Sequence, residues 1–305
     1  MDRLEAMIML VATVDAGSLS AAARALGVPV PTLSRKVADL EARLGTQLLT
    51  RTTRKLALTD AGAAYVASVR RILEQVEEAE REAAGEFLAP RGGLVITAPV
   101  RFGRRHVLPV IAGFLAQFPD IHVRLVLGDR RFDLLDDNID MAVRIGELPD
   151  SALIATRVGH LSVITCASPG LLKVEGAPRV PEDLTRRSCV STELQLAQDG
   201  WRYRDPVTGQ ARQVAIAPRL VTTAEAVADA AMAGVGFAQL LDYQGFEALR
   251  AGVLQRVLDD FEPAPLPVHL IHVARGQMPL KMRRFIDFAA PRLRQAIAGF
   301  GGAPS

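Results

Sequence analysis

Hydrophobic residues in the first sixty positions recur three and four residues apart in three segments. This spacing predicts a helix over residues 3–15 that ends at Gly17, and a second helix that Ser18 caps and Gly27 ends. A third helix is expected over about residues 31–44. Small alanines where the second and third helices cross, with a short glycine-containing turn between them, are typical of a helix-turn-helix.

Positive charge gathers on the third segment and on the stretch that follows it. Between Arg35 and Lys55 six basic residues stand against two acidic ones, whereas Asp60 to Glu86 carries seven acidic and three basic residues. Residues 48–59 predict two short strands around a basic tip, which is a wing. The charge pattern indicates one surface that faces a polyanion. We therefore expect a winged helix-turn-helix that binds double-stranded DNA; a helical subdomain that packs on another surface is the less favoured alternative.

The residues expected to contact DNA carry a hydroxyl group or a positive charge, or begin the third helix. Arginine and lysine reach guanine edges and phosphates, and hydroxyl groups suit either. The predicted contacts are Ser18, Ser20, Val30, Pro31, Thr32, Ser34, Arg35 and Lys36 from the helices, and Arg51, Thr52, Arg54 and Lys55 from the wing.

A long helix without proline is predicted after the wing, with Thr59 as its N-cap and an end near Gly85. At 1.5 Å per residue it would be ~40 Å long. Its apolar positions alternate steps of four and three, which is a heptad seam. The seam consists of Tyr65, Val69, Ile72, Val76, Ala79 and Ala83. We expect a homodimer through this seam, because two recognition helices one helical turn apart read a palindromic site; packing on the next domain of the same chain is the alternative.

Beyond a proline- and glycine-containing boundary at residues 90–93, strand and helix patterns alternate, which predicts a mostly parallel sheet with helices on its faces. The first lobe is expected to hold strands 94–98, 121–127 and 141–145, helices 107–118 and 131–137, and a returning strand 268–273 and helix 280–293. The second lobe is expected to hold strands 163–167, 188–190, 214–216, 219–221 and 235–239 and a helix over 224–232.

Several motifs at fixed spacing resemble the LysR-type transcriptional regulators. They are Asp15–Ala23, Leu26–Val28, Leu33–Val37, Leu40-Glu41, Leu44-Gly45, Leu48–Thr52 and Leu58–Gly62, followed by Phe118-Pro119, Asp140–Gly146, Ala167–Pro169, Pro181–Leu184 and Ala233–Gly236. The chain departs from the family at residues 29–31, where Pro-Val-Pro replaces the Ser-Gln-Pro of many members. This loses a hydroxyl cap and an amide able to read adenine. The resemblance implies a periplasmic-binding-protein-like effector domain, dimers that often pair into homotetramers, and RNA polymerase as a further partner.

The chain is accordingly interpreted as a multidomain α and α/β protein. Its expected parts are an N-terminal winged helix-turn-helix at 1–59, a long linker and dimerisation helix at 60–90, and a C-terminal two-lobed α/β effector-binding domain at 91–305. Lobe I is expected over about 91–162 and 267–298, and lobe II over about 163–266.

Ligands of open α/β sheets bind beyond the carboxyl ends of the strands, here between the lobes. The residues expected there are Ala98, Pro99, Val100, Arg101, Gly146, Glu147, Ser191, Thr192, Thr222 and Thr223. Backbone amides at the helix starts after Pro99 and Thr223 suit an anion. Our hypothesis is a small-molecule effector that bears a carboxylate, with Arg101 or Arg144 as its partner; the alternative is that these residues only pack or cap. Family members often place serine or threonine after the first strand, so Ala98, Pro99 and Val100 here favour a more apolar ligand.

Patterns for catalysis, a cofactor or a metal site are missing from the sequence. His269 and His272 are three apart on a predicted strand, so they point to opposite faces and cannot share a metal ion. The sequence Gly234-Val235-Gly236 lacks the third glycine of a dinucleotide motif and is interpreted as a tight turn into a buried strand. We expect no cofactor and no enzymatic activity; a solute-binding protein or a small-molecule enzyme built on the two-lobed domain is the alternative.

The composition is that of a globular protein, with 49% hydrophobic residues and a net charge of +2. No apolar run approaches the ~18 residues of a membrane span, and the first residues lack a signal-peptide pattern. Two cysteines, Cys166 and Cys189, fit a reducing compartment, so we expect a cytoplasmic protein. A redox switch between them is the less favoured alternative, because neither has an obvious activating base nearby.

Overall fold

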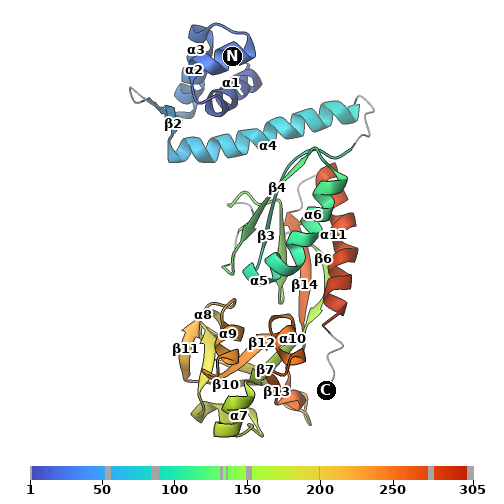
Figure 1. The fold of residues 1–305 in the computed structure, drawn as a ribbon. Coiled ribbons are helices and arrows are strands. Elements are labelled where there is room, and N and C mark those ends of the chain that lie inside the picture. Colours follow the sequence, from blue (N-terminus) through green and yellow to red (C-terminus); the bar gives the residue numbers. More distant parts are fainter. Residues whose placement is uncertain are drawn as a thin grey trace. The chain divides into compact units, whose positions relative to one another are not determined.

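The structure is a computed structural model that describes residues 2–51, 56–83, 89–130, 133–134, 137–148, 153–198, 200–273 and 278–300. The chain divides into two compact units, Met1–Ala89 and Pro90–Ser305, each of which is described by itself. Figure 1 labels their helices and strands. No helix in these ranges has the length and apolar character needed to cross a membrane.

The first unit is a winged helix-turn-helix followed by a long helix, as predicted. Its elements are α1 (Arg3–Asp15), α2 (Leu19–Leu26), α3 (Val30–Leu44), β1 (Leu49–Arg51), β2 (Leu56–Leu58) and α4 (Asp60–Ala83). The Ser18 hydroxyl accepts a hydrogen bond from the Ala21 amide and so caps α2. Gly27 and Gly45 end α2 and α3 in the left-handed region that favours glycine. The predicted caps and stops are confirmed.

The core of this unit lies where the inner sides of its helices meet the wing. Leu10, Leu33 and Leu40 are almost fully buried, and Ala22 and Ala23 are buried beside them, which allows α2 to approach its neighbours closely. Val66 of α4 belongs to the same core, so the first turns of the long helix are part of the DNA-binding unit. Each large side chain buried in this way contributes about 1.5–3 kcal/mol of transfer free energy.

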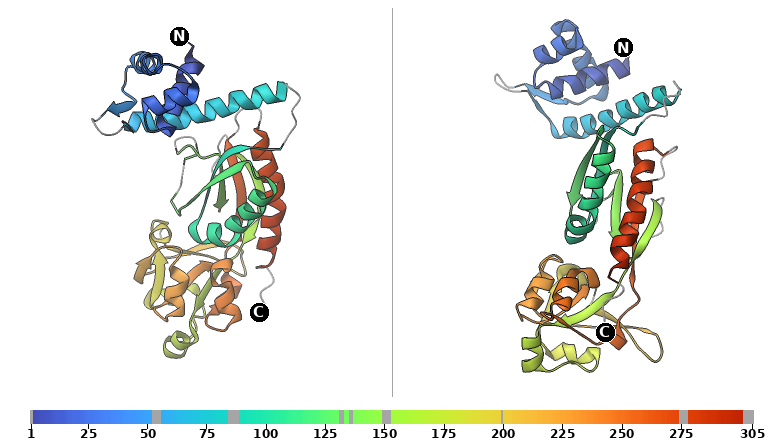
Figure 2. Two further views of the ribbon diagram at one scale, coloured as in Figure 1. Left: turned by 45° about the horizontal axis from the view of Figure 1, so that its top comes forward. Right: turned by 45° about the vertical axis from the view of Figure 1, so that its right-hand side comes forward.

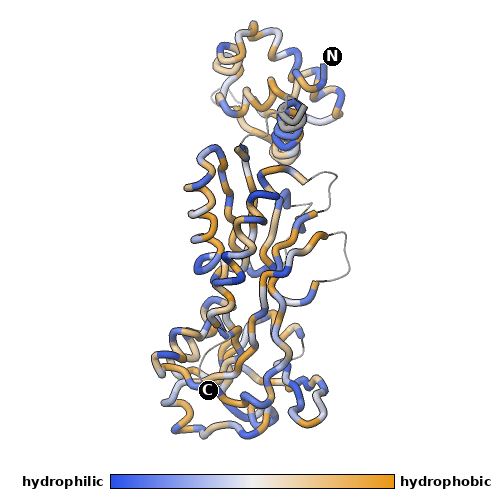
Figure 3. The backbone as a smooth tube through the Cα atoms, turned by 90° about the vertical axis from the view of Figure 1, so that its right-hand side faces the viewer, coloured by the Kyte–Doolittle hydropathy of each residue, from blue (hydrophilic) through white to orange (hydrophobic). Residues whose placement is uncertain are grey.

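Lobe I of the second unit is a five-stranded sheet with two long helices on one face. Its elements are β3 (Gly92–Ala98), α5 (Val100–Phe102), a π-helical turn (Gly103–Val107), α6 (Leu108–Gln117), β4 (Ile121–Leu127), β5 (Met141–Ile145), β6 (Leu153–Leu161), β14 (Leu266–Val273) and α11 (Leu280–Ala298). The strand order is β4-β3-β5-β14-β6, and β3 runs parallel to both β4 and β5. Helices α6 and α11 lie side by side along the sheet (Figure 1). Hydrophobic and hydrophilic residues alternate along the helical turns of this lobe, because only one side of each helix is buried (Figure 3).

Lobe II is a second five-stranded sheet, covered on both faces. Its elements are β7 (Val163–Ala167), α7 (Pro169–Glu175), a 3-10 helix (Pro181–Arg186), β8 (Cys189–Thr192), α8 (Glu193–Leu196), β9 (Trp201–Arg204), β10 (Ala211–Val214), β11 (Pro218–Thr222), α9 (Val227–Met232), β12 (Phe237–Leu241), α10 (Asp242–Arg250), β13 (Gln255–Val257) and a 3-10 turn (Asp259–Phe261). The order is β11-β8-β12-β7-β13. Residues of α9 and α10 cover one face, and the β9–β10 hairpin with Trp201 and Tyr203 covers the other.

The chain passes between the lobes twice, from β6 into β7 and from β13 into β14 (Figure 2). At the first passage the Ser162 amide donates to the Asp242 carboxylate at 3.0 Å, and the Asp242 amide donates to the Ser162 carbonyl at 2.9 Å. This pair of hydrogen bonds joins the point where the chain enters lobe II to the start of α10.

Several predicted elements differ from the structure. The strand expected over 214–216 is β10 at Ala211–Val214, and the one expected over 235–239 is β12 at Phe237–Leu241. The helix expected over 131–137 is not confirmed: its described residues 133, 134 and 137 are not helical, and residues 131–132 and 135–136 fall outside the described ranges. The predictions missed β6, β9, α7 and α10 altogether. Strand β6 escaped detection because its exposed and buried positions do not alternate regularly.

The predicted tight turn at Gly234-Val235-Gly236 is confirmed. Gly234 ends α9 with φ +76°, and a Cβ on Gly236 would lie 2.5 Å from the Ser188 carbonyl oxygen. Backbone therefore approaches backbone where β12 enters the sheet beside β8, and only glycine leaves room for it.

We expect Gly236→Ala to lower the free energy of unfolding by about 1–3 kcal/mol, because the added methyl group meets main-chain atoms. The matched control is Gly170→Ala in α7, where an added Cβ meets nothing within 4 Å. It should be neutral or stabilise by about 0.4–1 kcal/mol. Urea unfolding of both variants measures the difference, and equal stabilities would contradict the close approach.

Candidate functional site

The outer face of α3 is an exposed helical surface of the DNA-binding unit. Arg35 and Pro31 are exposed, Val30 is 39% exposed, and Thr32 and Ser34 are half-buried. The opposite side of the helix is fixed in the core, so this face has a defined orientation. Helix α3 has no side-chain cap, because Pro29 occupies its N-cap position. The loss of a hydroxyl cap that the sequence predicted is confirmed.

Lys36 departs from its predicted role. Its ammonium group forms an ion pair with the carboxylate of Glu5 in α1, and only 20% of the side chain is exposed. The pair links α1 to α3, so in this structure Lys36 serves the helical core rather than presenting a free charge to DNA.

The other predicted DNA contacts lie at the start of α2 and on the wing. The Ser18 hydroxyl already accepts from the Ala21 amide, whereas Ser20 is exposed. Arg51 ends β1, but its side chain lies outside the described residues. The remaining wing positions, Thr52, Arg54 and Lys55, also lie outside them.

The heptad seam of α4 is only partly available to a second chain. Val69 is fully buried, which corrects its assignment as a dimer contact. Tyr65 is half-buried and packs in part against the core of its own unit. Ile72 is 40% exposed and Val76 is half-buried. The side chains of Ala79 and Ala83 lie outside the described residues. An ion pair between Arg70 and Asp15 of α1 further ties the first half of α4 to the DNA-binding unit.

In the second unit, the predicted effector residues fall at the carboxyl edges of the two sheets. Because β3 and β5 are parallel, Ala98 to Arg101 and Gly146 with Glu147 lie at one edge of lobe I. Because β8 and β11 are parallel, Thr192 and Thr222 are aligned at one edge of lobe II. Ala98 is fully buried; Pro99, Val100, Gly146 and Thr222 are half-buried, and Glu147 and Thr223 are exposed.

Arg101 joins these two edges. Its Nη1 donates to the Glu225 carbonyl at 3.0 Å and its Nη2 donates to the Gln244 carbonyl at 2.9 Å. The side chain is only 18% exposed, and the carboxylate of Asp229 lies 3.9 Å from Nη1. The guanidinium therefore binds main-chain oxygens of lobe II and is not left open for a ligand, which corrects its predicted role in this state of the protein.

Other groups at the junction are also occupied by the chain itself. Arg104 pairs with the Glu225 carboxylate at 2.6 Å, which adds a second contact between the lobes. The Val100 amide, predicted to receive an anionic ligand, donates to the Asp129 carboxylate at 3.1 Å. The helix start after Pro99 thus already holds a negative charge from its own lobe, in accord with the preference of such positions for anions.

Ser191 and Thr192 have structural roles that the sequence did not reveal. Ser191 is fully buried; its hydroxyl donates to Gln195 Oε1 at 3.0 Å and accepts from the indole of Trp201 at 3.3 Å. The Thr192 hydroxyl accepts from the Gln195 amide at 3.2 Å and caps α8. The assignment of Ser191 as an effector contact is corrected, because its buried side chain satisfies polar groups of the core. Thr192 is half-buried, and its predicted contact stays a prediction.

An aromatic cluster at the junction was missed by the sequence analysis. His106 of lobe I stacks at 5.0 Å from Phe102 and 5.8 Å from Tyr243 of lobe II, with Phe300 at 5.2 Å. Burial lowers the pKa of His106 to about 4, with a smaller effect of Arg105, so its imidazole is neutral at neutral pH. No single-residue pattern marks these positions, because they come from three distant segments.

The two cysteines lie in separate layers of lobe II. Cys166 belongs to the core on the α9 and α10 side of the sheet, and Cys189 to the core under the β9–β10 hairpin. Burial raises the pKa of each thiol to about 12. A disulfide between them would have to pass through the sheet, so the alternative of a switch formed by this pair is wrong.

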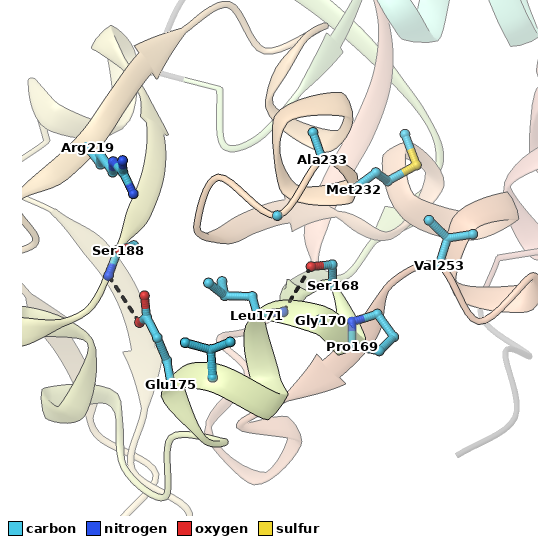
Figure 4. A pocket seen from close by; sticks show the side chains of 12 residues that line it. Ser168, Pro169, Gly170, Leu171, Glu175, Ser188, Arg219, Met232, Ala233 and Val253 are labelled. Atoms are coloured by element: carbon cyan, nitrogen blue, oxygen red, sulfur yellow. Dashed lines mark hydrogen bonds between the residues drawn. The ribbon is translucent and has the colours of Figure 1, made fainter.

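A cavity of about 630 Å³ opens on lobe II. Figure 4 shows the side chains that line it. The cavity is lined by α7, the end of α9 and Arg219. Two of its polar groups are engaged within the chain: Ser168 caps α7, and the Glu175 carboxylate accepts from the Ser188 amide at 3.3 Å. None of the predicted effector residues lines this cavity.

Comparison with known proteins assigns the chain to a family. Residues 4–63 match the family described as "Bacterial regulatory helix-turn-helix protein, lysR family", and residues 89–294 match "LysR substrate binding domain". An HTH-type transcriptional regulator of Xanthomonas campestris is 32% identical and is matched over 94% of this chain and 84% of its own. An HTH-type transcriptional repressor of Pseudomonas aeruginosa is 34% identical, over 94% of this chain and 91% of its own.

Solved structures agree with this assignment. The full-length virulence activator AphB of Vibrio cholerae, a member of the LTTR family, shares 27% identity with a TM-score of 0.59, over 94% of this chain and 98% of that one. CrgA, a LysR-type regulator from Neisseria meningitidis, shares 29% identity with a TM-score of 0.60, over 95% of this chain and 98% of that one. These relatives are regulators rather than enzymes. The chain therefore belongs to the LysR family of DNA-binding transcriptional regulators and carries that family's effector-binding domain.

Proposed function

We propose that this regulator binds a palindromic promoter site as a homodimer, or as a tetramer of two dimers, and responds to a small carboxylate-bearing effector held between the lobes. The observation that carries the proposal is the exposed outer face of α3, held in one orientation by the buried side of the same helix. RNA polymerase is the further partner expected at a promoter. Two buried thiols suit the reducing cytoplasm as the place of action.

Arg35 and Lys36 make a matched pair for testing the DNA contact. We expect Arg35→Ala to weaken DNA binding at least about fivefold, the lower end of the cost of one lost base contact. Lys36→Met should weaken it less, because the ammonium group already pairs with Glu5, and should instead lower the unfolding midpoint.

Fluorescence anisotropy on a duplex from the promoter region beside the protein's own gene measures both variants. The titrations are repeated between 50 and 200 mM salt. A steep fall in affinity over this range indicates that basic side chains neutralise DNA phosphates. Equal losses for the two variants would contradict the distinction between them, and no specific binding by the wild type would contradict the proposed promoter site.

The dimer is proposed to form through the part of the α4 seam that begins at Ile72. We expect Ile72→Glu to produce monomers, because a carboxylate would be buried in an apolar interface. The control Ala64→Glu places the same charge on an exposed position of the same helix outside the seam. Val69→Glu should unfold the first unit instead, since Val69 is fully buried within the chain.

Sedimentation velocity with circular dichroism separates these outcomes. The proposed seam predicts a folded monomer for Ile72→Glu and an unchanged assembly for Ala64→Glu. A dimer that persists in Ile72→Glu would place the interface elsewhere.

We propose that the effector's carboxylate takes the place of Glu225 on Arg104, which loosens one contact between the lobes. The pair is exposed on the Arg104 side, where 65% of the side chain is open to solvent, so an exchange of partners is sterically allowed. Thr223 is exposed next to this pair in sequence and offers a hydroxyl group to the same ligand.

Removing the competing charge should therefore strengthen carboxylate binding. We expect Glu225→Gln to raise the affinity for the effector up to about fivefold, the range of an exposed ion pair, and Arg104→Ala to lower it. The control is Glu247→Gln, an exposed carboxylate on α10. Thermal shift and calorimetry with a panel of aliphatic and aromatic acids measure the effect, and a panel without a single binder would refute the carboxylate.

A further inference from the structure

The peptide units around Leu48, between α3 and the wing, are held by side chains from both neighbouring helices. The Glu41 carboxylate, from α3, accepts hydrogen bonds from the Leu48 amide at 2.7 Å and from the Leu49 amide at 3.0 Å. On the other side, the Thr59 amide donates to the Leu48 carbonyl at 3.0 Å and the Thr59 hydroxyl donates to the Gln47 carbonyl at 2.8 Å. We call this group of contacts the Leu48 joint.

At the start of α4, the main chain of Gly62 packs directly against the main chain of Leu48. A Cβ on Gly62 would lie 2.0 Å from the Leu48 carbonyl oxygen and 2.8 Å from its carbon. The Gly62 amide donates to the Thr59 hydroxyl at 2.9 Å, so Thr59 both caps α4 and holds the wing strand. The Leu48 side chain is 1% exposed and anchors the same peptide in the core.

These contacts make α3, the first wing strand and α4 one rigid body. Glu41 lies in the last turn of α3, and Thr59 and Gly62 lie at the first turn of α4. A carboxylate with two amide donors is a charge-assisted arrangement, stronger than neutral hydrogen bonds. The direction of α4 therefore fixes the direction of the recognition helix.

A rigid link of this kind has a consequence for DNA. One additional base pair between two half-sites moves the second one by ~3.4 Å along the axis and rotates it by ~35°. Two recognition helices that are fixed to paired α4 helices cannot follow such a change. A loose link would let each DNA-binding unit adjust by itself.

We propose that Glu41, Thr59 and Gly62 are positioning residues through which the protein discriminates the spacing between the two halves of its operator. This inference rests on the proposed dimer on a palindromic site. These three residues would then contribute to operator specificity although they are not among the proposed DNA contacts.

The experiment uses the full-length protein and a duplex selected by the wild type from random-sequence DNA. Affinities are measured by fluorescence anisotropy for four probes: the selected spacing, one base pair more, one base pair fewer, and a single half-site. The affinity of the wild type should fall about tenfold or more when the spacing changes, which is comparable to the cost of one mismatched base pair.

Thr59→Val keeps the shape of the side chain and removes the hydroxyl, whereas Thr59→Ser keeps the hydroxyl and is its matched control. Gly62→Ala adds a methyl group against the Leu48 carbonyl, although alanine by itself favours a helix by about 1 kcal/mol. We expect Thr59→Val to bind the three spacings with affinities that lie within about threefold of one another. The same is expected of Gly62→Ala. Thr59→Ser should keep the wild-type ratio. Glu41→Gln retains the acceptor oxygen but loses the charge that strengthens both hydrogen bonds, so it should lower the ratio.

The half-site probe separates specificity from general damage. Affinity for it should stay within about twofold of the wild type in Thr59→Val, with an unfolding midpoint that shows a folded protein. A folded Thr59→Val or Gly62→Ala variant that keeps the wild-type spacing ratio would overturn the inference, as would half-site binding that falls as much as binding to the full operator. A wild type that binds half-sites and full operators equally would instead refute the proposed dimer on a palindrome.

Discussion

The second unit depends on a constraint of chain topology: both of its sheets are built from a chain that passes between the lobes only twice. Parallel strands within each lobe bring their carboxyl ends to one edge, and the contacts of Arg101 and Arg104 with residues that follow β11 show that these edges meet. Ser162 and Asp242 bind each other's amide groups at one passage, and burial raises the pKa of this aspartate. Relative movement of the lobes must therefore occur around these points and against the side chains that bridge the two edges.

The same physical device recurs in both units: a side chain satisfies main-chain groups of a neighbouring segment. Glu41 does so for two amides beside the wing, and Arg101 does so for two carbonyls across the lobes. Unpaired main-chain groups in a partly buried place cost free energy, so such contacts are maintained unless another donor or acceptor replaces them. A ligand bound at the junction, as proposed, would therefore compete with groups of the chain.

The sequence predicted a helix most accurately where the residues that begin and end it lie within or next to that helix. The caps and stops at Ser18, Gly27 and Gly45 follow from local chemistry, and so do the bounds of the first three helices. Prediction failed where the partner is distant in sequence: Lys36 with Glu5, Val100 with Asp129, and Ser191 with Trp201 are joined only by the fold. The heptad seam shows an intermediate case, because its period was visible but the full burial of Val69 within the chain was not.

The bridge made by Arg101 has a consequence for how the protein changes over generations. Its acceptors are the carbonyl groups of positions 225 and 244, which every amino acid possesses, so mutations that replace those side chains leave the acceptors in place. The bridge itself therefore does not depend on which side chains stand at these two positions. Position 101 has no such freedom, since a lysine there lacks the planar fork that reaches two carbonyls at once. A contact between both lobes thus depends on a side chain of lobe I alone.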